Sequence, residues 1–326
     1  MQAILLRALL SLLTLGQVHA VVTWRTIGCD NWSFKGASID DIWDNALLMT
    51  TNAQSQRNAI PTNAAGMLSG NGRRAGANAK FMFGVKFDKL TGMDAAGTTT
   101  MNTVNDIYTR IQSGLEGTLP GIDVDNAFLF CESNGLTYGN FPGNPFQQAV
   151  WYTTVTNGPV TEYIALQYTA GRGPGKPCME VGKDQIYQAR TFDTVQVING
   201  NPQTFTGVIL CPEQFEKNGL RVVPTLSQGF NAVVSGNNKR PTPADYNSIS
   251  GNLVHEMTHV VGRSQGRRYL DEAAGFNQCL DLAIRDQSTA LTNPDNYRVF
   301  AEMSMSPSTK WGAETPAPLV SAAPAH

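Results

Sequence analysis

The segment that most constrains this chain is the pentapeptide HEMTH at residues 255–259. If the segment is helical, its two histidines lie about one turn apart, so both imidazoles face the same side and can share one metal ion. Glu256 then lies beside the metal, where its carboxylate can take a proton from metal-bound water. The chain holds 4 histidines, and the other two stand at position 19 and at the last position. We therefore predict a catalytic zinc site with His255 and His259 as ligands and Glu256 as general base.

The residues around the motif favour a helix. Ser248 or Ser250 is a suitable N-cap, and Gly262 is a natural place for the helix to end. One face of the segment is apolar and consists of Leu253, Val254, Met257, Val260 and Val261. The alternative is an ordinary amphipathic helix whose histidines happen to lie four residues apart. The unbroken apolar face around the motif favours the metal site.

Residues 1–20 have the pattern of a secretory signal peptide. Arg7 provides a basic start, residues 9–15 an apolar core, and residues 18–20 a small-residue cleavage site. The apolar run is too short to cross a bilayer, and no later segment is long enough. A buried N-terminal helix is the alternative interpretation. We expect a secreted, extracellular protein.

Charge and cysteine content narrow the possible partners. The chain carries 24 Lys and Arg against 26 Asp and Glu, a formal net charge of −2. No basic patch indicates nucleic acid, and no polybasic stretch indicates an anionic membrane. We expect peptide or protein substrates, no nucleic acid, no stable membrane insertion and a monomer. The 5 cysteines suit an oxidising compartment, with two disulfides and one free thiol, but their spacing alone does not choose the partners.

The hydrophobic pattern divides the chain into a helical beginning, a strand-rich middle and a helical end. Helical periodicity marks residues 39–52 and 101–115, and a loop rich in Gly, Asn and Arg is expected at 63–78. The expected strands are residues 127–131, 162–169, 194–198 and 207–211. The closing helices are the motif helix, residues 271–284 and a helix from about residue 296. Residues 312–326, rich in Ala and Pro, are expected to form a disordered tail.

The third zinc ligand is expected to be a carboxylate. A catalytic zinc ion takes three protein ligands and leaves a position for water. A third histidine soon after the helix is absent, since the remaining one ends the expected tail. The downstream candidates are Asp271, Glu272, Asp281, Asp286, Asp295 and Glu302.

Two downstream segments resemble those of the fungal aspzincins, the family of deuterolysin and the peptidyl-Lys metalloendopeptidases. In that family HExxH is followed by GTxDYxYG, whose aspartate is the third ligand, and then by an Asn-Ala-Asp segment. Here residues 269–275 (YLDEAAG) occupy the first place and residues 293–301 (NPDNYRVFA) the second. Alignment on Gly275 puts Asp271 on the ligand aspartate. The resemblance extends over most of the chain, and it is strict only at HExxH.

The pattern and the resemblance together imply a fold and a reaction. The fold is a single zincin-like α+β domain over residues 21–311, mostly helical, with a small antiparallel or mixed sheet before the motif helix. A helical part would cover about 21–120 and a catalytic part about 125–311. The reaction would be peptide-bond hydrolysis by a secreted zinc metalloendopeptidase with one Zn²⁺ ion. The glutamate of the motif would take a proton from the water and then protonate the leaving amine.

The resemblance also bears on the disulfides. It implies a bond between the N-terminal helical region and the start of the strand region, which is Cys29–Cys131. The remaining pair is predicted to be Cys178–Cys211, because Cys211 ends an expected strand, and Cys279 is left free.

Departures from the family pattern affect the expected activity. The tyrosines that follow the ligand aspartate are replaced by Glu272 and Ala274, so Tyr269 is the candidate to stabilise the oxyanion. Asp295 is matched, but Arg298 stands where lysine-specific members carry a glutamate, and a cation there would repel a substrate lysine. Asp295 and Arg298 are therefore candidate specificity residues in an enzyme that is not strictly lysine-directed. Alternatively, Asp295 is a turn or N-cap residue and Arg298 extends into solvent.

Two further alternatives concern the metal and the function. Asp271 could be a solvated carboxylate at a helix start, with Glu302 as the third ligand, as in gluzincins. The protein could also be a secreted zinc-binding or surface-interaction protein on the same fold, with little or no protease activity. Glu256 separates these functions, because hydrolysis depends on that carboxylate and metal binding alone does not.

Overall fold

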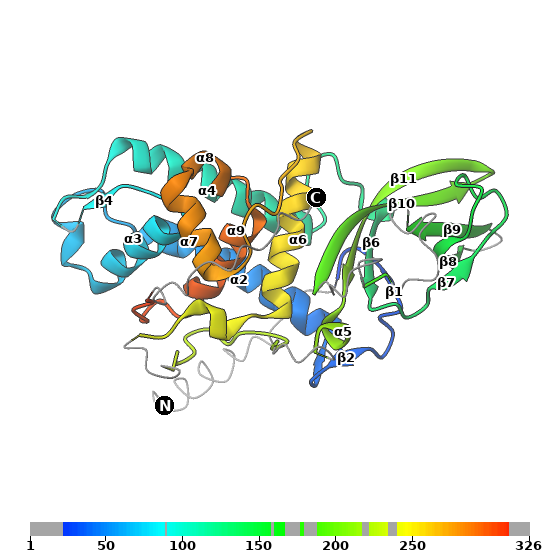
Figure 1. The fold of residues 1–326 in the computed structure, drawn as a ribbon, viewed down its shortest axis with the longest axis horizontal. Coiled ribbons are helices and arrows are strands. Elements are labelled where there is room, and N and C mark those ends of the chain that lie inside the picture. Colours follow the sequence, from blue (N-terminus) through cyan, green and yellow to red (C-terminus); the bar gives the residue numbers. More distant parts are fainter. Residues whose placement is uncertain are drawn as a thin grey trace, which may run out of the picture.

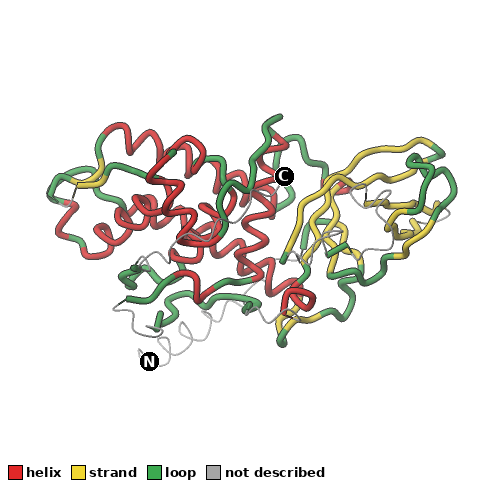
Figure 2. The backbone as a smooth tube through the Cα atoms, viewed as in Figure 1, coloured by secondary structure: helices red, strands yellow, loops and turns green. Residues whose placement is uncertain are grey.

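The computed structural model describes residues 22–88, 90–157, 160–166, 177–178, 188–216, 222–233 and 240–312. The signal peptide expected at residues 1–20 and the expected tail from residue 313 onward lie outside the described residues. In the part described, helices gather on one side and a sheet on the other, with helix α6 (Ile249–Ser264) between them (Figure 1, Figure 2). The fold is therefore α+β, as predicted.

Helices from both ends of the chain pack around α6. Helices α2 (Ile39–Ala59) and α4 (Ala95–Leu115) lie in sequence between the first strand of the sheet and its other six, α9 (Pro294–Ser304) follows the sheet, and all three contact α6. Helix α3 (Gly70–Phe83) contacts α7 (Gly275–Arg285), α8 (Gln287–Ala290) and α9. The shorter helical segments are η1 (Gly66–Leu68), η2 (Val124–Asn126), α5 (Pro212–Glu216) and η4 (Pro243–Tyr246).

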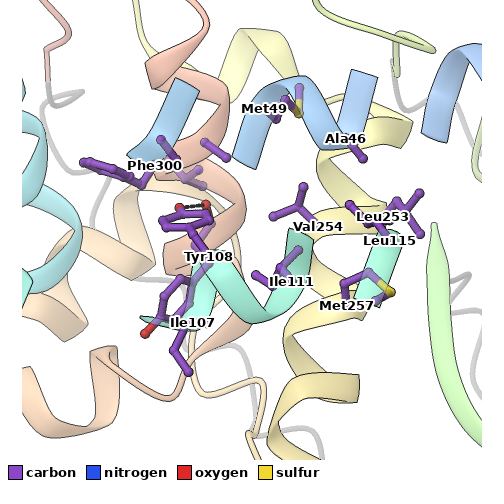
Figure 3. Close-up of a cluster of buried hydrophobic side chains, with 14 of the residues drawn as sticks. Ala46, Met49, Ile107, Tyr108, Ile111, Leu115, Leu253, Val254, Met257 and Phe300 are labelled. Carbon is purple, nitrogen blue, oxygen red and sulfur yellow. Dashed lines mark hydrogen bonds between the residues drawn. The ribbon is translucent and has the colours of Figure 1, made fainter. Parts of the chain in front are cut away.

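The apolar face of α6 packs against apolar side chains of α2 and α4 (Figure 3). Leu253, Val254 and Met257 of α6 are fully buried, which confirms the apolar face predicted for the motif helix. Their surroundings on α2 and α4 include Ala46, Met49, Ile107, Tyr108, Ile111 and Leu115. Each large apolar side chain buried in this way stabilises the fold by about 1.5–3 kcal/mol. The packing therefore determines which face of α6 remains available for the motif histidines.

The described residues form one mixed sheet of seven strands, in the order β1-β6-β11-β10-β9-β8-β7. The strands are β1 (Arg25–Ile27), β6 (Ala127–Cys131), β7 (Thr137–Gly139), β8 (Val150–Asn157), β9 (Val160–Leu166), β10 (Ala189–Ile198) and β11 (Asn201–Leu210). Strand β6 pairs in parallel with β1 and β11, and the other pairs are antiparallel. The β10–β11 hairpin turns at Asn199 and Gly200, whose φ angles of 51° and 77° suit an Asn-Gly turn.

The predicted elements correspond to observed ones, and the sheet is larger than predicted. The helices expected at residues 39–52 and 101–115 are parts of α2 and α4, and the four expected strands overlap β6, β9, β10 and β11. Strands β1, β7 and β8 have no counterpart among the expected elements. Two small hairpins complete the fold, β2 (Ser33–Phe34) with β3 (Ala37–Ser38) and β4 (Phe87–Asp88) with β5 (Gly92–Met93).

The prediction of a loop over residues 63–78 is wrong for its second half, which lies in α3. Ser69 caps this helix, and its hydroxyl accepts a hydrogen bond from the Gly72 amide at 3.3 Å. A Cβ at Gly76 would lie 2.2 Å from a ring carbon of Phe87, so this glycine permits close packing. The tertiary contact outweighs the low helix propensity of glycine, about 1 kcal/mol per residue.

The disulfide predictions are confirmed. Cys29 is bonded to Cys131, which ties the segment after β1 to the end of β6. Cys178 is bonded to Cys211, and Cys279 is a buried free thiol. Among the described residues, no helix combines the length and apolar character needed to span a membrane.

Candidate metal centre and active site

Helix α6 carries the motif. Ser248 is its N-cap, with the hydroxyl accepting a hydrogen bond from the Gly251 amide at 2.9 Å. The prediction that Gly262 ends the helix is wrong, since α6 continues to Ser264. Gly262 instead faces Tyr269, whose Cγ would lie 3.0 Å from an added Cβ. The absence of a side chain at this position lets the loop after α6 return close to the helix.

Asp271 reaches both imidazoles from the loop between α6 and α7. Its Oδ1 lies 3.2 Å from Nε2 of His255 and 3.2 Å from Nε2 of His259. Two ligands of a tetrahedral zinc ion with bonds of about 2.0 Å lie about 3.3 Å apart. The observed spacing is therefore compatible with ligands around one ion, and it is also that of a hydrogen bond. Helix α7 begins at Gly275, so Asp271 is a loop residue and not a helix-start carboxylate.

The other ring nitrogens are held by hydrogen-bond acceptors. Nδ1 of His255 lies 2.8 Å from Oδ1 of Asp295, and Nδ1 of His259 lies 3.0 Å from the carbonyl oxygen of Tyr269. Because a carbonyl and an ionised carboxylate can only accept, we assign a hydrogen to both Nδ1 atoms. In neutral imidazoles this leaves the lone pair on each Nε2, which is the state that binds a metal ion.

The close contacts between these side chains shift the pKa values of His255 and Asp271. Burial lowers the pKa of His255, but its contacts with Asp271 and Asp295 outweigh burial and raise that pKa well above its ordinary value. Burial raises the pKa of Asp271, yet the two imidazoles hold it below its ordinary value. Two imidazoles and a carboxylate form a donor set typical of zinc. The residues present therefore fit a zinc ion.

Glu256 lies beside these three side chains. It is 4% exposed, and its Oε1 lies 3.9 Å from Nε2 of His255. Its Oε2 accepts a hydrogen bond from the Thr191 hydroxyl at 2.6 Å. The Asp271 side chain is 54% exposed, so solvent reaches the site from the side of this loop. Glu256 is thus close enough to act on a water at the metal position.

Asp295 and Arg298 lie on α9, behind His255, and are 5% and 8% exposed. Nε and Nη2 of Arg298 donate to Oδ1 and Oδ2 of Asp295 at 2.8 and 2.9 Å. Oδ1 also accepts from His255, and Oδ2 accepts from the Gly275 amide. These four hydrogen bonds use the acceptor positions of the carboxylate. The alternative that Arg298 extends into solvent is therefore wrong, and the N-cap of α9 is Asn293, not Asp295.

Glu302, the alternative third ligand, is held at the N-terminus of α6. Its Oε1 accepts from the amide and the hydroxyl of Ser248 at 3.0 and 3.1 Å. Its Oε2 accepts from Nη1 of Arg298 at 3.3 Å. Burial raises the pKa of Glu302 to about 7, against the opposing effect of Arg298. The carboxylate thus binds the N-cap residue of α6 and pairs with Arg298.

The Tyr269 hydroxyl lies near the C-terminal end of α6, where it donates to Oε1 of Gln265 at 3.4 Å. The side chain is 6% exposed, and burial raises the pKa of the phenol. The group that Tyr269 contributes to the site is its carbonyl oxygen, which accepts from His259.

Two contacts of the site have no counterpart in the sequence-based predictions. Thr191 of β10 binds Glu256, and no sequence pattern links these two positions. Asn293 binds the loop between α6 and α7. Its Oδ1 accepts from the amides of Glu272 and Ala273 at 2.9 and 3.1 Å, and its Nδ2 donates to the Ala273 carbonyl at 3.0 Å. The Asn-Pro pair was a usable signal for a helix start at α9, although not for this contact.

No family model matches the chain, and no curated protein matches it. A solved structure described as a zinc peptidase from Grifola frondosa is similar, with 17% sequence identity and a TM-score of 0.36. The match covers 80% of this chain and 90% of that one. A TM-score this low does not establish a shared fold.

Proposed function

We propose that this protein is a zinc metalloendopeptidase. The observation that carries the proposal is the contact of one Asp271 oxygen with Nε2 of both His255 and His259, at 3.2 Å each, with Glu256 alongside. Two imidazoles and one carboxylate leave a coordination position for water, as hydrolytic zinc sites require. In an ordinary amphipathic helix, two imidazoles are not expected to converge on a carboxylate from a separate loop.

The side chains of the site have different proposed roles in hydrolysis. His255, His259 and Asp271 would hold the metal, and zinc, when bound, supplies Lewis-acid chemistry toward water and a carbonyl. Glu256 takes a proton from the attacking water and delivers it to the leaving amine. Asp295 and the Tyr269 carbonyl orient the two imidazoles through their Nδ1 atoms, as groups behind metal ligands commonly do.

The proposed substrates are peptides or proteins, with cleavage that is not strictly lysine-directed. A lysine ammonium in a pocket must be paired with a carboxylate that has free acceptor capacity. Asp295 has its four hydrogen bonds from His255, Gly275 and Arg298 instead. Leu270, next to Asp271, is 51% exposed and gives the open side of the site an apolar residue. These features favour uncharged residues after the scissile bond.

The proposed location is outside the cell. The two disulfides are compatible with an oxidising compartment, where such bonds form and persist. Residues 21–311 would form one catalytic domain after removal of residues 1–20, acting as a monomer. Helices α2 and α3, which precede β6 in sequence, contact α9, which follows β11, and this supports a single unit.

The second candidate function is a zinc-binding or surface-interaction protein without turnover. It is favoured by the position of the Tyr269 hydroxyl at Gln265, together with Glu272 and Ala274 in place of the family tyrosines. On this alternative the same three ligands bind zinc, and nothing stabilises the oxyanion well enough for catalysis.

Metal analysis and a casein digest of the purified mature protein test the proposal together. One zinc per chain with cleavage supports the peptidase, and zinc without cleavage supports the second candidate. Glu256→Gln should keep the zinc and lower kcat by about a hundredfold or more, the scale of acid–base residues. Unchanged proteolysis in this variant would refute the mechanism, and a metal-free wild-type protein would refute both functions.

A further inference from the structure

The hydroxyl of Thr191 contacts the proposed general base. Its Oγ1 lies 2.6 Å from Oε2 of Glu256 and 3.1 Å from the main-chain carbonyl oxygen of the same residue. A hydroxyl donates only one proton, and a charged carboxylate at the shorter distance is the stronger acceptor. The bond to Oε2 is therefore the principal one.

Thr191 lies in a strand that is hydrogen-bonded within the sheet. It lies in β10, where it pairs with Val208 of β11 in an antiparallel ladder. Strand β10 also contacts α6, the helix that carries Glu256. The hydrogen bond thus joins the sheet to the motif helix at the residue that would do acid–base chemistry. A hydroxyl fixed in a strand can hold a carboxyl group in one orientation more firmly than water can.

We propose that Thr191 is a positioning residue that sets the rotation of the Glu256 carboxyl group. With Oε2 bound to Thr191, Oε1 is the oxygen that lies toward the metal ligands, 3.9 Å from Nε2 of His255. Oε1 then accepts the proton of the water. Oε2 can accept from Thr191 whether or not Oε1 carries that proton, so the orientation persists through the cycle. The inference rests on the proposed hydrolytic role of Glu256.

The kinetic test compares threonine substitutions on one strand. Thr191→Val should lower kcat by about tenfold to a hundredfold with little change in KM, the scale expected when a reacting group is misplaced. Zinc content should not change, because Thr191 contacts none of the proposed ligands. Thr191→Ser keeps a hydroxyl and should retain most of kcat. Thr194→Val is the matched control, since the Thr194 hydroxyl donates to the Phe205 carbonyl at 3.2 Å.

A second measurement does not depend on turnover. A double-mutant cycle of Thr191→Val and Glu256→Ala, followed by urea denaturation of the zinc-free protein, should show coupling of about tenfold or more in the unfolding equilibrium constant, as for hydrogen bonds to charged groups. Equal kcat values in Thr191→Val and Thr194→Val, or coupling below about twofold, would overturn the inference. If the wild-type protein cleaves no peptide, the proposed function fails while the cycle still tests this contact.

Discussion

Replacement of Arg298 by methionine tests the buried charges behind the metal site. Arg298 donates to Asp295 at 2.8 and 2.9 Å and to Glu302 at 3.3 Å, and it is 8% exposed. Removing one partner of a buried ion pair costs about 3–5 kcal/mol, because the charge left behind is uncompensated. Asp295 would keep its hydrogen bonds from His255 and Gly275. We therefore expect a loss near the lower limit, about 3 kcal/mol in the free energy of unfolding at about pH 8.

The loss should depend on pH through Glu302. Its pKa is about 7 in the folded protein, above the ordinary value of 4.5. A carboxyl group with a raised folded pKa stabilises the fold fully below its unfolded pKa, and this contribution is lost as the pH rises through the folded value. At about pH 5 Glu302 is protonated in the wild type and in the variant, where the loss of Arg298 raises its pKa further, so the substitution leaves no unpaired charge on Glu302. The cost of the substitution should then shrink by roughly 1–2 kcal/mol, the equivalent of about one pKa unit.

The assay is urea denaturation of the oxidised protein, with a chelator present, at about pH 5 and about pH 8. Glu302→Gln is the control, since its amide oxygen can still accept from Ser248 but carries no charge. In the Glu302→Gln background, Arg298→Met should cost the same at both pH values. Two results would refute this account of Asp295, Arg298 and Glu302. One is a loss of unfolding free energy below about 1 kcal/mol for Arg298→Met at the higher pH, and the other is an equal loss at both pH values when Glu302 is unchanged.

The remaining predictions concern specificity and zinc binding. Arg298→Glu should strongly destabilise the protein, because it adds a third carboxylate beside Asp295 and Glu302, and it should not shift cleavage toward lysine. A wild-type soluble yield and Tm in this variant would contradict the prediction. In the wild type, cleavage mapping on a denatured protein mixture should show no majority of cuts before lysine, and such a majority would contradict the inferred substrate preference. Asp271→Ala should weaken zinc affinity by more than about a hundredfold, which is more than the loss expected when a group that only orients a ligand is removed. Wild-type affinity of this variant in equilibrium dialysis would show that Asp271 is not a ligand. Asn293→Ala removes the hydrogen bonds to the loop after Asp271 and should weaken zinc binding by about tenfold. An unchanged zinc affinity would show that Asn293 does not position this loop.

The motif helix could be predicted from the sequence because its signals are local. The spacing of His255 and His259, the Ser248 cap and the apolar face all act within one helix, and the structure has that helix with the cap and the apolar face buried. Helices α2 and α4 and four of the sheet strands follow from periodicity in the same way. Helix α3 does not, because close packing against Phe87 favours glycine at position 76, where propensity alone indicates a loop.

The surroundings of the motif depend on contacts between segments far apart in the chain. Asp295, Arg298 and Glu302 are ordinary charged residues in the sequence, suited equally to substrate, solvent or metal. Helix α9 packs against α6 and buries all three, so Asp295 binds His255, Arg298 binds Asp295, and Glu302 binds Ser248. A buried charge must be paired with whatever the fold brings beside it. The sequence by itself identified the candidate metal-binding pair and the candidate base, and only the tertiary structure decided which side chains hold them in place.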